Sequence, residues 1–371
     1  MRRIVQNLSL VLFGICCGLF LIEVALYLTG RYDDLVSQKL VVSSAIWERP
    51  VNTIEYQNHP DLGVPVEIRT DADGVRNHTD MPTHEKGSII AFFGDSFTEN
   101  RRIEDRFSFT SVLDAATRPG TRVVNYGVDG YGLDQAYLRY KKYEQHDIKH
   151  VVYVFCENDL RNLYETALAD VIDGKIRFIP PRINAIYRVI GSLRLTYLVI
   201  SAYYQLRALV RNERAGNILK LEWSDVGKEQ RIRFHDRYAD SIVLDLLSQR
   251  STGATLELVK KFILLLQSWR HEVESAGRTF SVFVLPRPID NEVALTLFRD
   301  FDGRVVYSAE YFGDYRNFRF AHDDHWNEYG NLQAAKFILS NEVFGFRGVV
   351  GGILDEESLK HGIDAYYKAP K

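Results

Sequence analysis

The sequence predicts an α/β domain in which helices cover both faces of a parallel sheet. Three apolar runs, at 88–93, 122–126 and 151–155, have the length and composition of buried strands. A turn follows each run, and helical patterns follow the first two turns at about 109–116 and 133–145. This repeated order of strand, turn and helix is typical of parallel sheets, because each helix returns the chain to the same end of the sheet.

The composition is that of a globular protein without a nucleic-acid surface. The chain has 371 residues, of which 46% are hydrophobic, enough for one large or two modest domains. The net charge of −3 and the lack of lysine runs or zinc-type Cys/His spacing indicate that nucleic acid is not a partner. Cys16 and Cys17 lie in an N-terminal apolar stretch, so Cys156 has no disulfide partner in the rest of the chain.

Residues 8–29 form that apolar stretch, which is broken by a single charge at Glu23. It is long enough to span a bilayer, so we expect an uncleaved transmembrane anchor within residues 1–31; a cleaved signal peptide is the alternative. Arg2 and Arg3 precede it and predict a cytoplasmic N-terminus, with the remainder extracytoplasmic, either periplasmic or at the cell surface. Glu23 either reaches water at the outer interface or contacts a membrane partner.

Two segments depart from the repeated order. Residues 32–87 are polar and rich in turns, and we interpret them as a stalk that becomes a lead-in packed on the domain. Residues 161–253 are expected to form a helical insertion, whose apolar helix at 193–211 either caps the domain or lies on the membrane surface. A helix at 256–273 and a strand at 280–285 then return the chain to the sheet.

Polar residues follow each of the first three strands. Gly94, Asp95 and Ser96 follow the first, Gly127 follows the second, and Asn158 follows the third. Because the carboxyl ends of parallel strands meet at one edge, we expect these residues to converge where α/β sheets bind ligands. A Gly-Asp-Ser turn is also an ordinary start of a helix, so by itself it does not identify a nucleophile.

A fourth polar segment lies near the C-terminus. It contains His322, Asp323, Asp324, His325 and Trp326, and an apolar helix follows it at 332–344. The histidine and aspartate side chains can supply a general base and its orienting carboxylate. A metal site formed by His322, Asp324 and His325, or a solvated polar loop, are equally open alternatives, and Trp326 can stack on a sugar ring.

Together these segments supply what acyl transfer to a serine requires: a nucleophile, a base, a carboxylate and donors for the oxyanion. The four ordered blocks are Gly94-Asp95-Ser96, Gly127, Asn158-Asp159, and His325 ahead of Gly330. This pattern resembles the SGNH, or GDSL-like, hydrolase superfamily over roughly residues 89–344, and within it the membrane-anchored bacterial polysaccharide acyl esterases and O-acyltransferases. The resemblance implies a three-layer α/β/α domain of flavodoxin-like type at 88–371, with the insertion forming part of the substrate wall.

The resemblance also implies roles for individual residues. Ser96 would attack an ester carbonyl while His325 accepts its proton, and the backbone N–H groups of Ser96 and Gly127 with the Asn158 side chain would hold the oxyanion. Asp95 and Asp159 are expected to support the two turns.

Two departures from the family pattern affect this carry-over. Cys156 stands where the family has glycine, and we expect it to be a small buried filler. His322 occupies the usual position of the triad aspartate, so the resemblance points to Asp323, with Asp324 as the reserve.

The function that follows is that of a membrane-anchored, extracytoplasmic serine esterase or O-acyltransferase. Its expected partners are an acylated glycan, carrying acetyl esters, and a membrane protein that donates acyl groups; no cofactor or metal is expected. One alternative is a lipid or thioester hydrolase with the same triad. Another is a non-catalytic scaffold subunit of a polysaccharide modification or export complex. The sequence does not distinguish hydrolysis from transfer.

Overall fold

The computed structural model describes residues 2–29, 41–43, 46–76, 87–179, 253–321, 323–347 and 356–368, with single positions between 195 and 247. The chain divides into two units. The first comprises Met1–Leu40 with Pro181–Asp225, and the second comprises Val41–Pro180 with Val226–Lys371.

The second unit is built on a five-stranded parallel sheet. Its strands are β5 (Ser88–Phe93), β6 (Thr121–Asn125), β7 (Ile148–Phe155), β10 (Thr279–Val284) and β11 (Arg304–Tyr307). They lie in the order β11-β10-β7-β5-β6, and all neighbouring strands are parallel. This is the flavodoxin-like order, in which the winding reverses between the first and third strands, so the predicted parallel α/β fold is confirmed. Ligands of such sheets bind at the carboxyl ends of the strands that flank the reversal, here β5 and β7.

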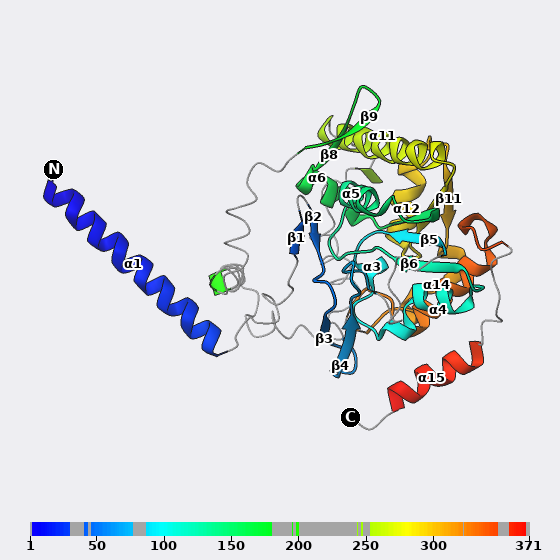
Figure 1. Ribbon diagram of the computed structural model, residues 1–371, viewed down its shortest axis with the longest axis horizontal. Coiled ribbons are helices and arrows are strands. Elements are labelled where there is room, and N and C mark those ends of the chain that lie inside the picture. The colour runs from blue at the N-terminus through cyan, green and yellow to red at the C-terminus, as the bar shows by residue number, and fades with distance from the viewer. Residues whose placement is uncertain are drawn as a thin grey trace. The chain divides into compact units, whose positions relative to one another are not determined.

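Helices cover both faces of this sheet (Figure 1). Alternate residues of β5 face opposite sides, so Ile89, Ala91 and Phe93 belong to one core and Ile90 and Phe92 to the other. The first core contains α5 (Leu133–Tyr143), α6 (Asn158–Thr166), α11 (Gly253–Ser275) and α12 (Pro288–Leu297). The second contains α4 (Phe109–Ala116), α14 (Glu328–Ser340) and α15 (Glu356–Lys368). The short elements are α3 (Ser96–Glu99), α13 (Ala309–Phe312) and 3-10 turns at Asp105–Phe107, Tyr315–Asn317 and Glu342–Phe344.

The lead-in forms two antiparallel hairpins ahead of the sheet. One pairs β1 (Val41–Ser43) with β2 (Ile46–Glu48), and the other pairs β3 (Ile54–Asn58) with β4 (Pro65–Arg69). Alternate residues of β4 are buried, including Val66 and Ile68, and Val75 belongs to the core of the sheet. The described part of the lead-in is therefore packed on the α/β domain.

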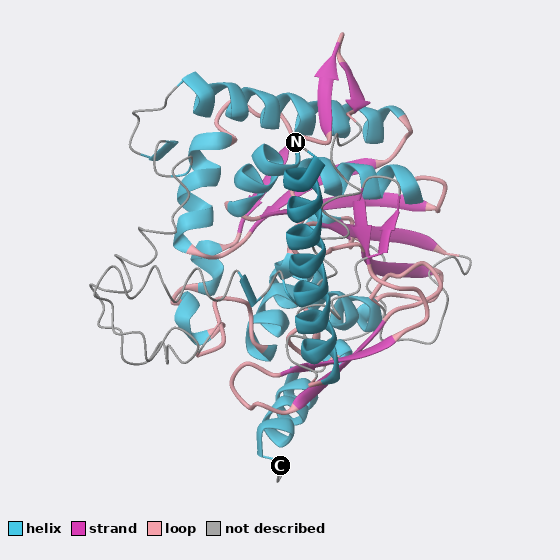
Figure 2. Ribbon diagram, turned by 90° about the vertical axis from the view of Figure 1, so that its left-hand side faces the viewer, coloured by secondary structure: helices cyan, strands magenta, loops and turns pink. Residues whose placement is uncertain are grey.

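The start of the expected helical insertion is instead a hairpin. After α6, β8 (Ala169–Ile172) pairs with β9 (Lys175–Phe178), and the hairpin projects beyond α11 (Figure 1; Figure 2). The cause is local, since Asp173 and Gly174 both have positive φ, at 52° and 71°, as a two-residue hairpin turn requires. Residues 169–178 of the segment 161–253, which was expected to be a helical insertion, are therefore a β-hairpin. The apolar helix expected at 193–211 lies outside the described residues, apart from isolated positions.

The first unit contains α1 (Arg2–Leu28), which includes the apolar stretch. In the part of the chain that the structure describes, no helix combines the length and the hydropathy needed to cross a membrane. The carboxylate of Glu23 accepts a hydrogen bond from the backbone N–H of Leu195 at 2.8 Å.

Candidate functional site

Ser96 is the first residue of α3 and follows β5 after a two-residue turn. Asp95 caps this helix, because its Oδ1 accepts the Phe97 N–H at 2.9 Å. A Cβ on Gly94 would collide with the Thr98 hydroxyl and lie 2.8 Å from the Val154 carbonyl oxygen, so the turn requires glycine. Burial raises the pKa of Asp95 above its usual range. Glycine at 94 and aspartate at 95 thus each have a structural reason.

The structure brings Ser96, His325 and Asp323 into one line of contacts. His325 Nε2 lies 2.7 Å from Ser96 Oγ, and His325 Nδ1 is hydrogen-bonded to Asp323 Oδ1. The same Asp323 oxygen accepts the His325 backbone N–H at 2.8 Å, and Arg102 Nε donates to Asp323 Oδ2 at 2.6 Å. Burial favours the neutral carboxyl, but the hydrogen bonds from His325 and the charges of His325 and Arg102 hold the pKa of Asp323 well below its usual range.

Aromatic packing fixes the histidine ring. Phe97 stacks on His325 with ring centroids 4.4 Å apart, and the Arg287 guanidinium lies 4.6 Å from the Phe97 centroid. Trp326 is 1% exposed and packs against Phe97 and Phe109. Stacking of Trp326 on a sugar ring was therefore a wrong expectation, because the indole is part of the core.

The other residues of this loop occupy different surroundings. Asp324 Oδ1 accepts a hydrogen bond from Arg319 at 3.0 Å, and Asp323 is the aspartate that contacts the His325 ring. His322 lies outside the described residues, so the alternative metal site of His322, Asp324 and His325 has no described geometry.

The three expected oxyanion donors differ in the hydrogen bonds that they already make. Among the described residues, no hydrogen bond occupies the Ser96 N–H. The Gly127 N–H, however, donates to Asn125 Oδ1 at 3.0 Å. Gly127 packs directly on α3, since an added Cβ would lie 2.5 Å from Thr98 Cβ and 2.6 Å from Glu99 N.

Asn158 opens α6 at the carboxyl end of β7. The Asn158 side chain and the Phe97 N–H both lower the pKa of Asp95, although burial raises this pKa by more. Asn158 therefore lies beside the serine turn. Asn158 Oδ1 is buried without a hydrogen-bond partner in the described structure. Asp159 fixes this turn, because its Oδ2 accepts the Tyr153 hydroxyl at 2.6 Å and the Cys156 N–H at 3.1 Å.

Cys156, Glu157 and Asp290 form a cluster of metal-ligand type next to Asn158. Arg287 occupies its centre: Nη2 lies 2.9 Å from Cys156 Sγ, Nε donates to Asp290 Oδ2 at 2.6 Å, and Nη2 also donates to Glu157. Although burial opposes it, the Arg287 charge lowers the pKa of Glu157 to about 2, while burial raises the pKa of the Cys156 thiol. A guanidinium thus stands where a metal ion would bind, and Cys156 has polar partners rather than serving only as filler.

The lead-in holds the loop that carries His325. His59 Nε2 lies 3.0 Å from Glu328 Oε1, and both side chains are fully buried. His59 Nδ1 accepts the Asp61 and Leu62 N–H groups, so the ring proton lies on Nε2 and is donated to Glu328. Tyr367 of α15 donates to Glu328 Oε2 at 2.6 Å. Sequence reasoning missed these partners and Arg102, because their positions in the chain are far from the residues they contact.

Comparison with known proteins gave matches among solved structures only. No family model and no curated protein matches the chain. A lipase/acylhydrolase from Enterococcus faecalis is 13% identical with a TM-score of 0.36, covering 72% of this chain and 100% of its own. A catalytic mutant of Axe2, an acetylxylan esterase from Geobacillus stearothermophilus, is 12% identical with a TM-score of 0.35, covering 73% and 100%.

A third solved structure is AlinE4, an SGNH-hydrolase family esterase. It is 13% identical with a TM-score of 0.33, covering 71% of this chain and 97% of its own. At such identities, function has to be derived from the residues of this chain.

Proposed function

We propose that this chain is a serine esterase that forms an acyl-enzyme on Ser96. The observation that carries the proposal is the continuous line of contacts from Ser96 Oγ through the His325 ring to Asp323. His325 and Arg102 bind separate oxygens of the Asp323 carboxylate and so favour its ionised form. The ionised carboxylate keeps the proton on His325 Nδ1 and leaves Nε2 to act as a base.

In the first step, Ser96 Oγ adds to the ester carbonyl and its proton passes to His325 Nε2. The oxyanion that forms is stabilised by the Ser96 N–H, which makes no hydrogen bond to another described residue, and by the Asn158 side chain, with Gly127 contributing if its N–H leaves Asn125. His325 then gives the proton to the departing alcohol, which breaks the ester bond. In the second step, His325 takes a proton from water or from an acceptor hydroxyl, which attacks the acyl-enzyme and restores Ser96.

For the substrate we propose an acetylated glycan, with hydrolysis or transfer to a sugar hydroxyl as the second step. Within the family that the sequence resembles, an Asp two residues before the histidine also occurs in members that modify polysaccharides, and the position of Asp323 supports this substrate class. The scaffold alternative requires a decayed site, and the contacts of Ser96, His325 and Asp323 argue against it.

The cellular setting is also a proposal. The apolar sequence at 8–29, preceded by Arg2 and Arg3, supports a membrane anchor with the α/β domain outside the cytoplasm, next to a membrane protein that donates acyl groups. Cell fractionation with protease treatment of intact cells tests this: a protein that is soluble, or protected from protease, contradicts it.

The function is tested on the full-length protein with p-nitrophenyl acetate, butyrate and octanoate, and by fluorophosphonate labelling. Ser96→Ala should abolish labelling and turnover. Ser340→Ala, which removes an exposed hydroxyl of α14, should leave both unchanged. Preference for acetate supports the glycan ester class, whereas preference for octanoate favours the lipid hydrolase alternative. A folded protein with neither turnover nor Ser96-dependent labelling contradicts the proposal.

A further inference from the structure

Glu99, three residues after Ser96, is a buried carboxylate with no part in the reaction described above. It is the last residue of α3 and is 1% exposed. Arg49 of the lead-in donates two hydrogen bonds to it, from Nε to Oε1 at 2.6 Å and from Nη2 to Oε2 at 2.9 Å. Against the effect of burial, the Arg49 charge keeps the pKa of Glu99 below its usual range. The pair is therefore ionised, and its geometry is bidentate.

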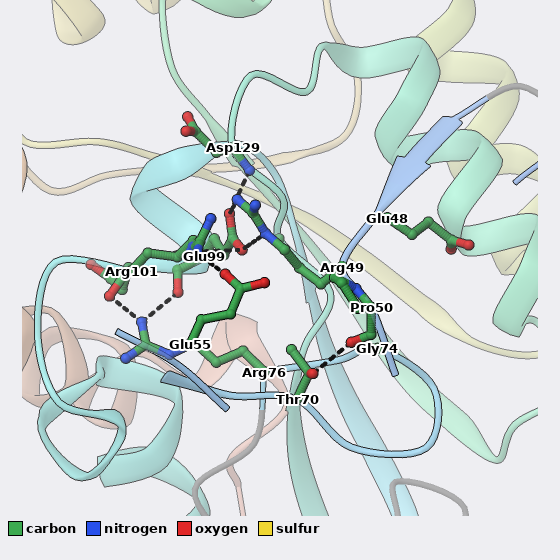
Figure 3. A network of polar contacts seen from close by, with 12 residues as sticks. Glu48, Arg49, Pro50, Glu55, Thr70, Gly74, Arg76, Glu99, Arg101 and Asp129 are labelled. Atoms are coloured by element: carbon green, nitrogen blue, oxygen red, sulfur yellow. Dashed lines mark hydrogen bonds and ion pairs between the residues drawn. The ribbon is translucent and has the colours of Figure 1, made fainter. Parts of the chain in front are cut away.

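Glu99 also reaches the turn that follows β6. Its Oε2 accepts the Asp129 N–H at 2.7 Å, and Asp129 lies two residues after Gly127 (Figure 3). One carboxylate thus connects the serine turn, the Gly127 turn and the lead-in. Figure 3 shows Glu99 between Arg49 and Asp129, with Glu48 directed away from it.

A second lead-in arginine holds the backbone at the end of α3. Arg76 Nη1 donates to the Glu99 carbonyl oxygen at 2.7 Å, and its Nη2 donates to the Ile103 carbonyl oxygen at 2.6 Å. Arg76 is also paired with Asp105. Because α3 is only four residues long, it cannot hold its own position, and these contacts with the lead-in supply the restraint.

We infer that Glu99 and Arg49 are positioning residues that fix the location of Ser96 relative to His325 and to the Gly127 turn. This inference rests on the proposed function, because it concerns the same nucleophile. Ser96 Oγ needs to stay within hydrogen-bond distance of His325, and a displacement of about 1 Å in a reacting group costs about a hundredfold in rate. The lead-in thus supports the active site through Arg49, which binds Glu99.

The test compares Glu99→Gln with Glu48→Gln in the full-length protein. Glu48 is a matched control because it is also a buried carboxylate paired with basic side chains. It lies in the lead-in, and its partners are Arg139 at 3.2 Å and Lys142 at 2.6 Å, both on α5. We expect Glu99→Gln to lower kcat for p-nitrophenyl acetate by about tenfold or more, with KM changed by less than about twofold. Fluorophosphonate labelling of Ser96 should slow by the same factor. Glu48→Gln should lower the thermal midpoint similarly and leave kcat and labelling unchanged.

Arg49→Lys provides a second variant if Glu99→Gln does not fold. It keeps the charge and loses the bidentate geometry, so the same fall in kcat is expected. A folded Glu99→Gln or Arg49→Lys protein with normal kcat overturns the inference, as does an equal loss of kcat in Glu48→Gln. A wild-type protein that behaves like Ser96→Ala overturns the proposed function, and the positioning role with it.

Discussion

Arg102 donates a hydrogen bond to Asp323 Oδ2 at 2.6 Å, while His325 is bonded to the other oxygen of the same carboxylate. Arg102 lies in the loop just after α3, so the loop that follows the nucleophile also binds the carboxylate at the far end of the contact line. The serine and histidine segments are thereby joined at two points.

Arg102→Gln should make stability less dependent on pH. The folded-state pKa of Asp323 is depressed, so its contribution is present at neutral pH and is lost progressively as the pH falls below about 5. We expect the variant to be about 1 kcal/mol less stable than wild type at pH 7, with the difference shrinking only as the pH falls below about 4 toward the depressed folded-state pKa of Asp323. Urea unfolding across this range measures it. Arg347→Gln, which breaks an exposed pair with Glu342, is the control, and a pH-independent difference for Arg102→Gln contradicts the expectation.

Asp323→Asn should reduce kcat by about a hundredfold to ten-thousandfold, because the amide no longer fixes the histidine tautomer. Asp324→Asn should change kcat by about threefold or less, since Asp324 pairs with Arg319 in a partly exposed position. Steady-state kinetics with p-nitrophenyl acetate compare the two variants. Equal small effects at both positions leave a Ser96-His325 dyad.

Gly127→Ala should destabilise the protein by about 1–3 kcal/mol and slow the labelling of Ser96, because the new Cβ meets Thr98 and the backbone of Glu99. Gly253→Ala serves as the control, since no atom lies within 4 Å of its added Cβ. Urea unfolding and labelling rates are measured on both. Unchanged stability of Gly127→Ala speaks against the close packing of this turn on α3.

His59→Ala should cost about 2–3 kcal/mol, because it removes the buried donor to Glu328 and the acceptor of two backbone N–H groups. Tyr367→Phe removes one hydrogen bond from the same carboxylate and keeps the ring, so a smaller loss of about 1 kcal/mol is expected. Chemical denaturation measures both. A His59→Ala protein as stable as wild type means that Glu328 is supported in some other way.

The parts of the fold that sequence reasoning predicted are those with local signals. The strands β5, β7 and β10 are continuous apolar runs. Gly94 and Gly127 directly follow strands in the sequence, and the structure shows why glycine is needed there, since an added Cβ at either position would collide with neighbouring atoms. The edge strand β11 escapes prediction because its four residues are too few to show a period. The β8–β9 hairpin had a usable signal in Asp173-Gly174, which the expectation of a helical insertion overrode.

The residues around the candidate site divide in the same way. Ser96 and His325 stand in short motifs, and the Asn125 contact with Gly127 spans two residues, so an Asx turn was foreseeable. The partners Arg49 and Glu99 are 50 residues apart, and His59 and Glu328 are 269 apart. No local pattern specifies such pairs, because they exist only after the sheet has brought distant segments together.

His59 contacts Glu328 in the folded protein but lies 269 residues before it along the chain, so this contact forms only late in synthesis. His59 leaves the ribosome long before Glu328, and Tyr367 follows later still. A nascent chain that ends after α14 already carries Ser96, Asp323 and His325, yet its histidine loop lacks the support of α15. The proposed esterase activity is therefore expected to appear late in translation, once His59 and Tyr367 have both reached Glu328.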